Sequence, residues 1–255
     1  MKTKKVWAFI GLLAFAFAMS FTVISCGDDN EEENGTENNE GTSNTGKVGG
    51  GCSADKVVGT YHAITGEGST IMIQFLENGE GIVTEKYLDS STGRTVVVYD
   101  SYTYSMAGST GTFRKSNDYS GDGKAYTISF VDGFMFITEP DGDVEFILYK
   151  EGANLGKGDV SKFVGTWEQR DAYHYTKFIA KSNGTGTAYY EFTSNSYSDK
   201  AEIPFTFKAV NAYVASVTLT VDGEKETNYC GVFGGKLYLI EDDGEVDVDG
   251  ILTKK

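Results

Sequence analysis

The chain has 255 residues with a formal net charge of −15, and it contains 32 glycines, 16 tyrosines and 16 phenylalanines but only 2 prolines. The excess of acid argues against binding to nucleic acid, whose phosphates require basic residues, and against electrostatic attachment to anionic lipid. Abundant glycine and aromatic residues favour short strands joined by tight turns.

The first 25 residues predict a secretory signal. A lysine-rich start precedes an apolar run over 6–24, and the small residue Ser25 stands before Cys26. The sequence Val-Ile-Ser-Cys at 23–26 resembles the lipobox of bacterial lipoproteins, which implies cleavage before Cys26 and lipidation of this residue. Several acyl chains anchor a protein stably, at about 0.8 kcal/mol per buried methylene. The alternatives are plain secretion or a retained signal-anchor helix, since the run is close to the ~20 residues that span a bilayer.

Residues 26–53 predict an acidic, disordered tether. Segment 27–51 has almost no apolar residue, so it cannot bury enough surface to offset the entropy of ordering. The acidic run at 27–33 resembles the export signal of Bacteroidota surface lipoproteins, which implies lipid-anchored display on the outer face of the cell outer membrane. A solvated spacer is the alternative. Cleavage would leave 19 basic and 37 acidic residues, so the lipid on Cys26 is the expected membrane contact, and we expect no cofactor.

The rest of the chain is a tandem repeat. The sequence Lys-Val-Val-Gly-Thr-Tyr at 56–61 recurs as Lys-Phe-Val-Gly-Thr-Trp at 162–167, which is 106 residues later. Three further motifs recur in the same order at offsets of 105, 103 and 102 residues, as expected for two copies with small loop changes. The repeat predicts two domains of ordinary size, at 54–150 and 161–255, joined by a glycine-containing linker at 151–160.

Both copies show the period of a β-strand. Segments 70–76 and 125–131 alternate apolar and polar residues, and 245–249 alternates with its acids expected outward and its valines inward. Asn-Gly and Asp-Gly turns separate the runs. We predict about eight short strands per copy, no amphipathic helix, and at most one helical turn before each Val-Gly-Thr motif. The predicted fold class is all-β, with two tandem small antiparallel barrels.

The Gly-Thr-Trp motif that enters the first strand, followed by a chain of antiparallel hairpins, resembles lipocalin-like domains over 55–149 and 161–254. The resemblance implies that Trp167, and Tyr61 at the matching place, close one end of each barrel. The alternative is an aromatic side chain that packs in the core. Eight strands leave room for interior side chains or one small ligand. Because the strands are short, we expect side chains to fill the lumen, and a binding face on the loops or outer sheet is equally open.

Residues suited to catalysis or metal binding are few. The two histidines, His62 and His174, do not occupy matching repeat positions. A zinc site requires at least three convergent ligands, and Asp171 with His174 supplies only two. Segment 118–123 lacks the terminal glutamate of an EF-hand, and no nucleophile-elbow motif is present. Paired carboxylates for glycoside hydrolysis are not singled out. We therefore expect no catalytic residue, no metal ligand and no enzyme activity.

Two cysteines remain if Cys26 is acylated. The envelope permits disulfides, so a bond between Cys52 and Cys230 is available by count. However, Cys230 aligns with Ile128 of an alternating strand, and this position favours a buried, inert thiol.

Tyrosines near turns and strand edges would suit a sugar-binding platform, although strands favour aromatic residues in any case. The candidates are Tyr119, Tyr173, Tyr175, Tyr189, Tyr190 and Tyr197. Two functions are thus expected: a non-catalytic binding module for a small apolar ligand, a glycan or a partner protein, or a structural or accessory subunit of an envelope complex without its own ligand.

Overall fold

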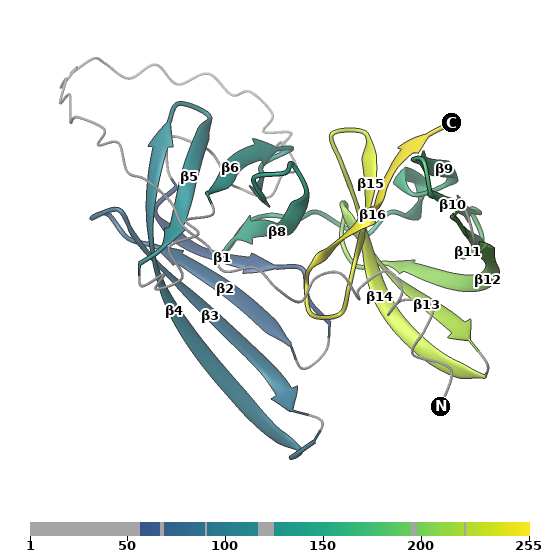
Figure 1. The fold of residues 1–255 in the computed structure, drawn as a ribbon, viewed down its shortest axis with the longest axis horizontal. Helices are drawn as coiled ribbons and strands as arrows, with labels where there is room; N and C mark the ends of the chain where they lie inside the picture. Colours follow the sequence, from purple (N-terminus) through teal and green to yellow (C-terminus); the bar gives the residue numbers. More distant parts are fainter. Residues whose placement is uncertain (1–56, 67–68, 90, 117–124, 195–197, 222) are drawn as a thin grey trace, which may run out of the picture.

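Two closed antiparallel barrels of eight strands each make up the described part of the chain (Figure 1). The predicted all-β fold with two tandem barrels is therefore confirmed. The predicted signal and tether, with Cys26 and Cys52, lie outside the described residues. Among the residues that are described, no helix has the length and apolar character needed to cross a membrane. The computed structural model describes residues 57–66, 69–89, 91–116, 125–194, 198–221 and 223–255.

In the first barrel each strand pairs with the next in sequence, and the last strand closes on the first. Its strands are β1 (Gly59–Ala63), β2 (Thr70–Phe75), β3 (Glu80–Asp89), β4 (Arg94–Ala107), β5 (Thr110–Lys115), β6 (Tyr126–Val131), β7 (Phe134–Thr138) and β8 (Val144–Lys150).

The second barrel repeats this topology and closes through β16 and β9. Its strands are β9 (Gly165–Arg170), β10 (His174–Ala180), β11 (Thr185–Thr193), β12 (Ser198–Ala209), β13 (Val214–Val221), β14 (Glu224–Phe233), β15 (Lys236–Ile240) and β16 (Val246–Lys254). The single helical turn predicted before its Val-Gly-Thr motif is the 3-10 helix η3 (Val160–Lys162), which Asp159 caps by accepting a hydrogen bond from the backbone N–H of Ser161.

Matching turns show how the repeated sequence produces the repeated fold. Gly79 and Gly184 have φ angles of 79° and 78°, a region that glycine adopts without strain. The carbonyl of Gly79 accepts a hydrogen bond from the N–H of Tyr104 at 2.7 Å, and that of Gly184 accepts one from Phe207 at 2.8 Å. Each glycine therefore makes the same contact, in which the turn before β3 or β11 accepts a hydrogen bond from β4 or β12.

The alternation within each strand directs one set of side chains into the barrel. In β2, Ile71, Ile73 and Phe75 are buried and the residues between them are more exposed. In β10, Phe178 and Ala180 are buried in the same way. Each barrel thus has its own apolar core.

A third apolar cluster lies between the barrels. The ring of Phe134 in the first barrel lies 4.6 Å from that of Phe233 and 4.9 Å from that of Tyr213 in the second. The other buried members are Ile64, Phe136, Ile147, Val214, Tyr238, Ile240 and Val246. The two barrels are therefore joined by a buried face in addition to the connecting segment.

Two backbone groups fix the edges of this face. The N–H of Gly234 donates to Asp132 Oδ2 at 2.7 Å, and the N–H of Gly66 donates to the carbonyl of Asp242 at 2.6 Å. In each contact a turn of one barrel meets a turn or loop of the other.

Candidate functional site

The lumen of the first barrel contains a cavity of about 230 Å³, beside the second barrel. This volume exceeds the roughly 150 Å³ of an apolar protein cavity that holds benzene. Apolar and aromatic side chains line the inner part, which we call the floor: Ile71, Ile73, Val83, Tyr102, Phe113, Tyr126 and Ile137. Its outer part, which we call the rim, comprises Glu85, Asp100, Lys115, Glu145, Phe146, Asp243 and Glu245.

The rim follows from strand alternation. Glu85, Asp100 and Lys115 each lie two residues from a floor residue on β3, β4 or β5, so they point to the same side of the sheet. They lie toward the more exposed end of the lumen. Lys115 Nζ lies 2.7 Å from Asp100 Oδ2, and both side chains are about one-third exposed. The rim lysine is therefore already paired with a carboxylate.

Glu145 is the most informative rim residue. It lies beside a register shift between β7 and β8, and its Oε2 atom is buried without a hydrogen-bond partner among the described residues. Burial, with repulsion from Glu139, raises the pKa of Glu145 to about 8, although a hydrogen bond from Tyr126 to the same carboxyl group lowers it. Such a buried acceptor is costly until a donor reaches it.

The second barrel completes the rim. Glu245 forms a β-bridge with Phe146 across the barrel junction. Burial raises the pKa of Glu245 to about 7, with a further contribution from Asp243. Burial also raises the pKa of Asp243. Because acids from both barrels converge here, a positive charge at the rim would stabilise all of their ionised forms.

The lumen of the second barrel is nearly filled. Its cavity measures about 40 Å³, enough for only a few water molecules. The rings of Phe178 and Phe205 stack at 4.1 Å inside it. The prediction that side chains fill the lumen thus holds for the second barrel, while the first retains a cavity.

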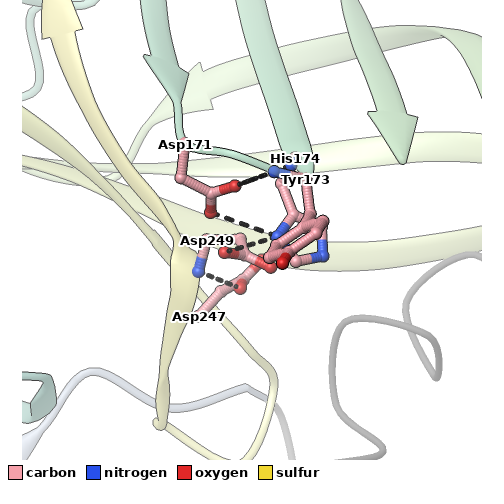
Figure 2. Close-up of polar contacts among 5 residues, drawn as sticks. All are labelled: Asp171, Tyr173, His174, Asp247 and Asp249. Atoms are coloured by element: carbon pink, nitrogen blue, oxygen red, sulfur yellow. Dashed lines mark hydrogen bonds and ion pairs between the residues drawn. The ribbon is translucent and has the colours of Figure 1, made fainter. Parts of the chain in front are cut away.

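A polar cluster at the second barrel joins three residues (Figure 2). His174 Nδ1 lies 3.1 Å from Asp171 Oδ2 and 3.6 Å from Asp249 Oδ1. Asp171 precedes β10, His174 begins it, and Asp249 lies on β16. Asp171 and His174 are three residues apart and could be paired from the sequence, whereas nothing local in the sequence connects Asp249 to them. Barrel closure, which brings the last strand beside the first, is the signal that would have found it.

The expectation that the acids of 245–249 point outward and the valines inward is wrong at residues 247 and 248. Asp247 is 4% exposed, whereas Val248 is 46% exposed. The pairing of β15 with β16 shifts register between Tyr238 and Ile240, and the shift directs Asp247 inward. Its Oδ1 accepts a hydrogen bond from the N–H of Asp249 at 2.9 Å.

The matching aromatic residues Tyr61 and Trp167 are buried in the two cores, at 0% and 2% exposure. The indole N–H of Trp167 donates to the carbonyl of Phe163 at 2.7 Å. Lys150 and Lys254 place their ammonium groups over the rings of Tyr61 and Trp167, at 5.5 and 5.1 Å from the ring centroids. Both rings therefore pack inside their barrels beneath a lysine.

The remaining candidates do not converge. His62 Nε2 lies 3.8 Å from Glu151 Oε1, on the first barrel. The thiol expected at Cys230 is confirmed as free and buried, and burial raises its pKa to about 12.

The candidate tyrosines occupy different surroundings. Tyr173 is 59% exposed. The guanidinium of Arg170 lies 4.0 Å from the ring of Tyr175, and the Tyr189 hydroxyl donates to Glu191 at 2.9 Å. Tyr190 lines the small cavity of the second barrel. Tyr119 and Tyr197 lie outside the described residues.

The long β3–β4 hairpin extends beyond the first barrel (Figure 1). Large apolar side chains are exposed along it, namely Tyr87, Leu88, Val97, Val98 and Tyr99. Because consecutive residues of a strand point to opposite faces, both faces of the hairpin carry exposed apolar side chains.

Comparisons with known proteins add little. No family model and no curated protein matches the chain. Among solved structures, it is similar to a crystal structure of a protein with unknown function from the DUF3598 family of Nostoc punctiforme, at 8% sequence identity and a TM-score of 0.25, over 77% of this chain and 93% of that chain. A likeness at this level carries no argument about fold or function.

Proposed function

We propose that the protein is a surface-displayed, lipid-anchored lipoprotein of the Bacteroidota type that binds a small ligand in its first barrel without catalysis. The ligand has an apolar body and a positively charged end. The observation that supports this is the 230 Å³ cavity with an apolar floor and an acidic rim. The apolar part of the ligand packs on the floor, and its cation faces the rim.

The charges at the rim determine which chemical group of the ligand can face it. Five carboxylates and one lysine line it, and the lysine is paired with Asp100. An ammonium group beside Glu145 would donate to its unpartnered Oε2 and stabilise its ionised form. A ligand carboxylate would meet like charges in a partly desolvated place and be rejected.

Binding fits the lining better than turnover does. The side chains around the cavity include no histidine, cysteine or serine among the described residues. The polar groups in the lining are carboxylates, tyrosine hydroxyls and one lysine that is already paired, and the carboxylates and hydroxyls can accept hydrogen bonds from a cation.

The ligand class is tested with three probes of one shape, measured by calorimetry on the full chain. We expect phenethylamine to bind more tightly than 2-phenylethanol, and phenylacetate not to bind. Glu145→Gln should weaken amine binding by about tenfold, the scale of a hydrogen bond between charged groups. Glu191→Gln, on the second barrel beside Tyr189, is the matched control and should leave binding unchanged. Equal affinity for amine and acid would refute a cation-selective site.

The location is tested separately. The basic start, apolar run and Cys26 junction support lipidation, and the acidic run that follows supports export. Cells grown with a palmitate analogue should label the wild-type protein but not Cys26→Ala. External protease should remove the wild-type protein from intact cells, and full protection would refute display outside.

A structural subunit of an envelope complex is the second candidate. The exposed apolar side chains of the β3–β4 hairpin favour it, because exposed apolar patches often mark contacts with partner proteins. Leu88→Ser with Tyr99→Ser should then release a partner from membrane extracts while amine binding stays unchanged.

A further inference from the structure

The geometry points to a divalent-cation site on the second barrel, in which Asp171, His174 and Asp249 bind Zn²⁺ and tie the β9–β10 turn to β16. This site is separate from the cavity of the first barrel, so the inference does not depend on the proposed ligand.

The spacing of the donor atoms fits a small tetrahedral ion. His174 Nδ1 lies 3.1 Å from Asp171 Oδ2 and 3.6 Å from Asp249 Oδ1. The three residues can offer ligand atoms that all lie within 4.8 Å of one another. Zinc bonds of about 2.0 Å in a tetrahedron place neighbouring ligand atoms about 3.3 Å apart, which lies between these two separations. The ion would therefore require only small side-chain movements.

Hydrogen bonds hold the Asp171 carboxylate and the backbone of Asp249 in place (Figure 2). Asp171 Oδ1 accepts hydrogen bonds from the N–H groups of Tyr173 at 2.6 Å and His174 at 2.7 Å, so its Oδ2 is directed toward the imidazole. The N–H of Asp249 donates to the buried Asp247. Outer contacts of this kind orient ligands around a metal.

The place in the fold supplies an independent argument. The ladder between β16 and β9 contains two register pairs in the described chain, Thr253 with Glu168 and Lys254 with Trp167. Asp171 and Asp249 lie beyond the unpaired end of this ladder. An ion held between them would close the barrel where no backbone pair of these strands does.

The ligand types select the ion. One imidazole and two carboxylates suit Zn²⁺, whereas Mg²⁺ and Ca²⁺ prefer oxygen ligands alone. Three protein ligands leave one position for water. Because the ligands join two separate segments, the expected effect is a cross-link that raises the stability of the second barrel.

The test titrates Zn²⁺ alone into the full chain with Cys52→Ser, so that this thiol cannot supply a ligand. We expect about one ion per chain and a raised melting temperature. His174→Ala and Asp249→Asn should each weaken binding at least about tenfold and abolish the rise. His62→Ala is the matched control, because it removes the other histidine, and it should bind as the parent does.

Asp249→Asn keeps the size of the side chain, so its result stands if His174→Ala unfolds. Zinc-edge X-ray absorption of the loaded protein should show nitrogen and oxygen ligands only. The proposal is overturned if Zn²⁺ fails to bind up to about 1 mM, if Asp249→Asn binds like the parent, or if sulfur is found around the ion. In each case the three residues form an ion-paired cluster and nothing more.

Discussion

The two barrels share one topology but differ in what their lumens contain. In the first, Tyr102 pairs with Lys115, and in the second Phe205 pairs with Leu219 at the matching place. The lysine thus corresponds to a leucine. At two further equivalent positions, an acid of β4 corresponds to an apolar residue of β12, and an acid of β3 corresponds to a tyrosine of β11. These pairs are Asp100 with Ile203 and Glu85 with Tyr190.

The side chains at a few inward positions therefore decide whether the lumen of a barrel keeps a cavity or is filled. Strand number and closure are the same in both copies, so they do not set the volume of the lumen. Charged side chains at the rim stay toward water and leave space behind them, whereas apolar side chains at the same positions close over the core. The two copies therefore share a topology, while the first keeps a cavity of about 230 Å³ and the second one of about 40 Å³.

The strongest loss of stability is expected in the apolar core of the second barrel. Trp167 is 2% exposed and its N–H is bonded to the carbonyl of Phe163, so Trp167→Ala should lower the free energy of unfolding by about 3–5 kcal/mol. Trp167→Tyr, which copies the first barrel, should cost about 1–2 kcal/mol. Urea unfolding measures both. A cost below about 1 kcal/mol for the alanine variant would contradict the assigned core role.

The next effect concerns pH and the acidic rim. The pKa of Glu145 is raised from 4.5 to about 8, so between these values the folded state keeps a proton that the unfolded chain has lost. Its contribution to stability is therefore complete below the lower value and is lost as the pH rises through the higher one. The melting temperature should fall from about pH 5 to about pH 9.

Glu145→Gln should flatten this profile and raise the free energy of unfolding at about pH 9 by about 2 kcal/mol. Amine binding to the wild type should strengthen over the same range, because the cation requires the carboxylate. Glu191→Gln provides the comparison from the second barrel, and an unchanged slope in Glu145→Gln would show that this residue does not govern the profile.

A smaller effect is expected from converting rim positions to their counterparts. Asp100→Ile or Lys115→Leu alone leaves one charge without its partner, whereas the double variant copies the second barrel. A double-mutant cycle should give a coupling of about 0.5–1 kcal/mol, since both side chains are about one-third exposed. Lys115→Leu should tighten amine binding and Asp100→Ile should weaken it. If the two single variants changed the affinity for the amine in the same direction and by the same amount, rim charge would not select the ligand.

The smallest stability effect is expected on the projecting hairpin. Tyr99 is 69% exposed, so Tyr99→Ser should change the free energy of unfolding by less than about 0.5 kcal/mol. Thermal melting measures this, and a larger loss would place the ring in a contact that supports the barrel.

Much of the fold could be predicted because repeat and alternation are local signals. The Gly-Thr-Tyr and Gly-Thr-Trp motifs begin β1 and β9, and Cys230 is buried where the alignment with Ile128 placed it. The inward turn of Asp247 could not be predicted, because a register shift leaves the alternation of residue types unbroken. The cavity could not be predicted either, because its volume depends on how side chains from several strands fill the lumen.

The apolar face between the barrels has a consequence for their origin. Asp132 and Gly234 are hydrogen-bonded to each other, and they are 102 residues apart in the sequence. Phe136 and Tyr238, which are matching positions of the two copies, are also 102 residues apart, and their rings lie 5.4 Å from each other. Equivalent parts of two copies thus meet each other, as they do across the two-fold axis of a homodimer. A single barrel freed from its neighbour would therefore present a self-complementary face, and the chain has the arrangement of a symmetric dimer made permanent by one covalent link.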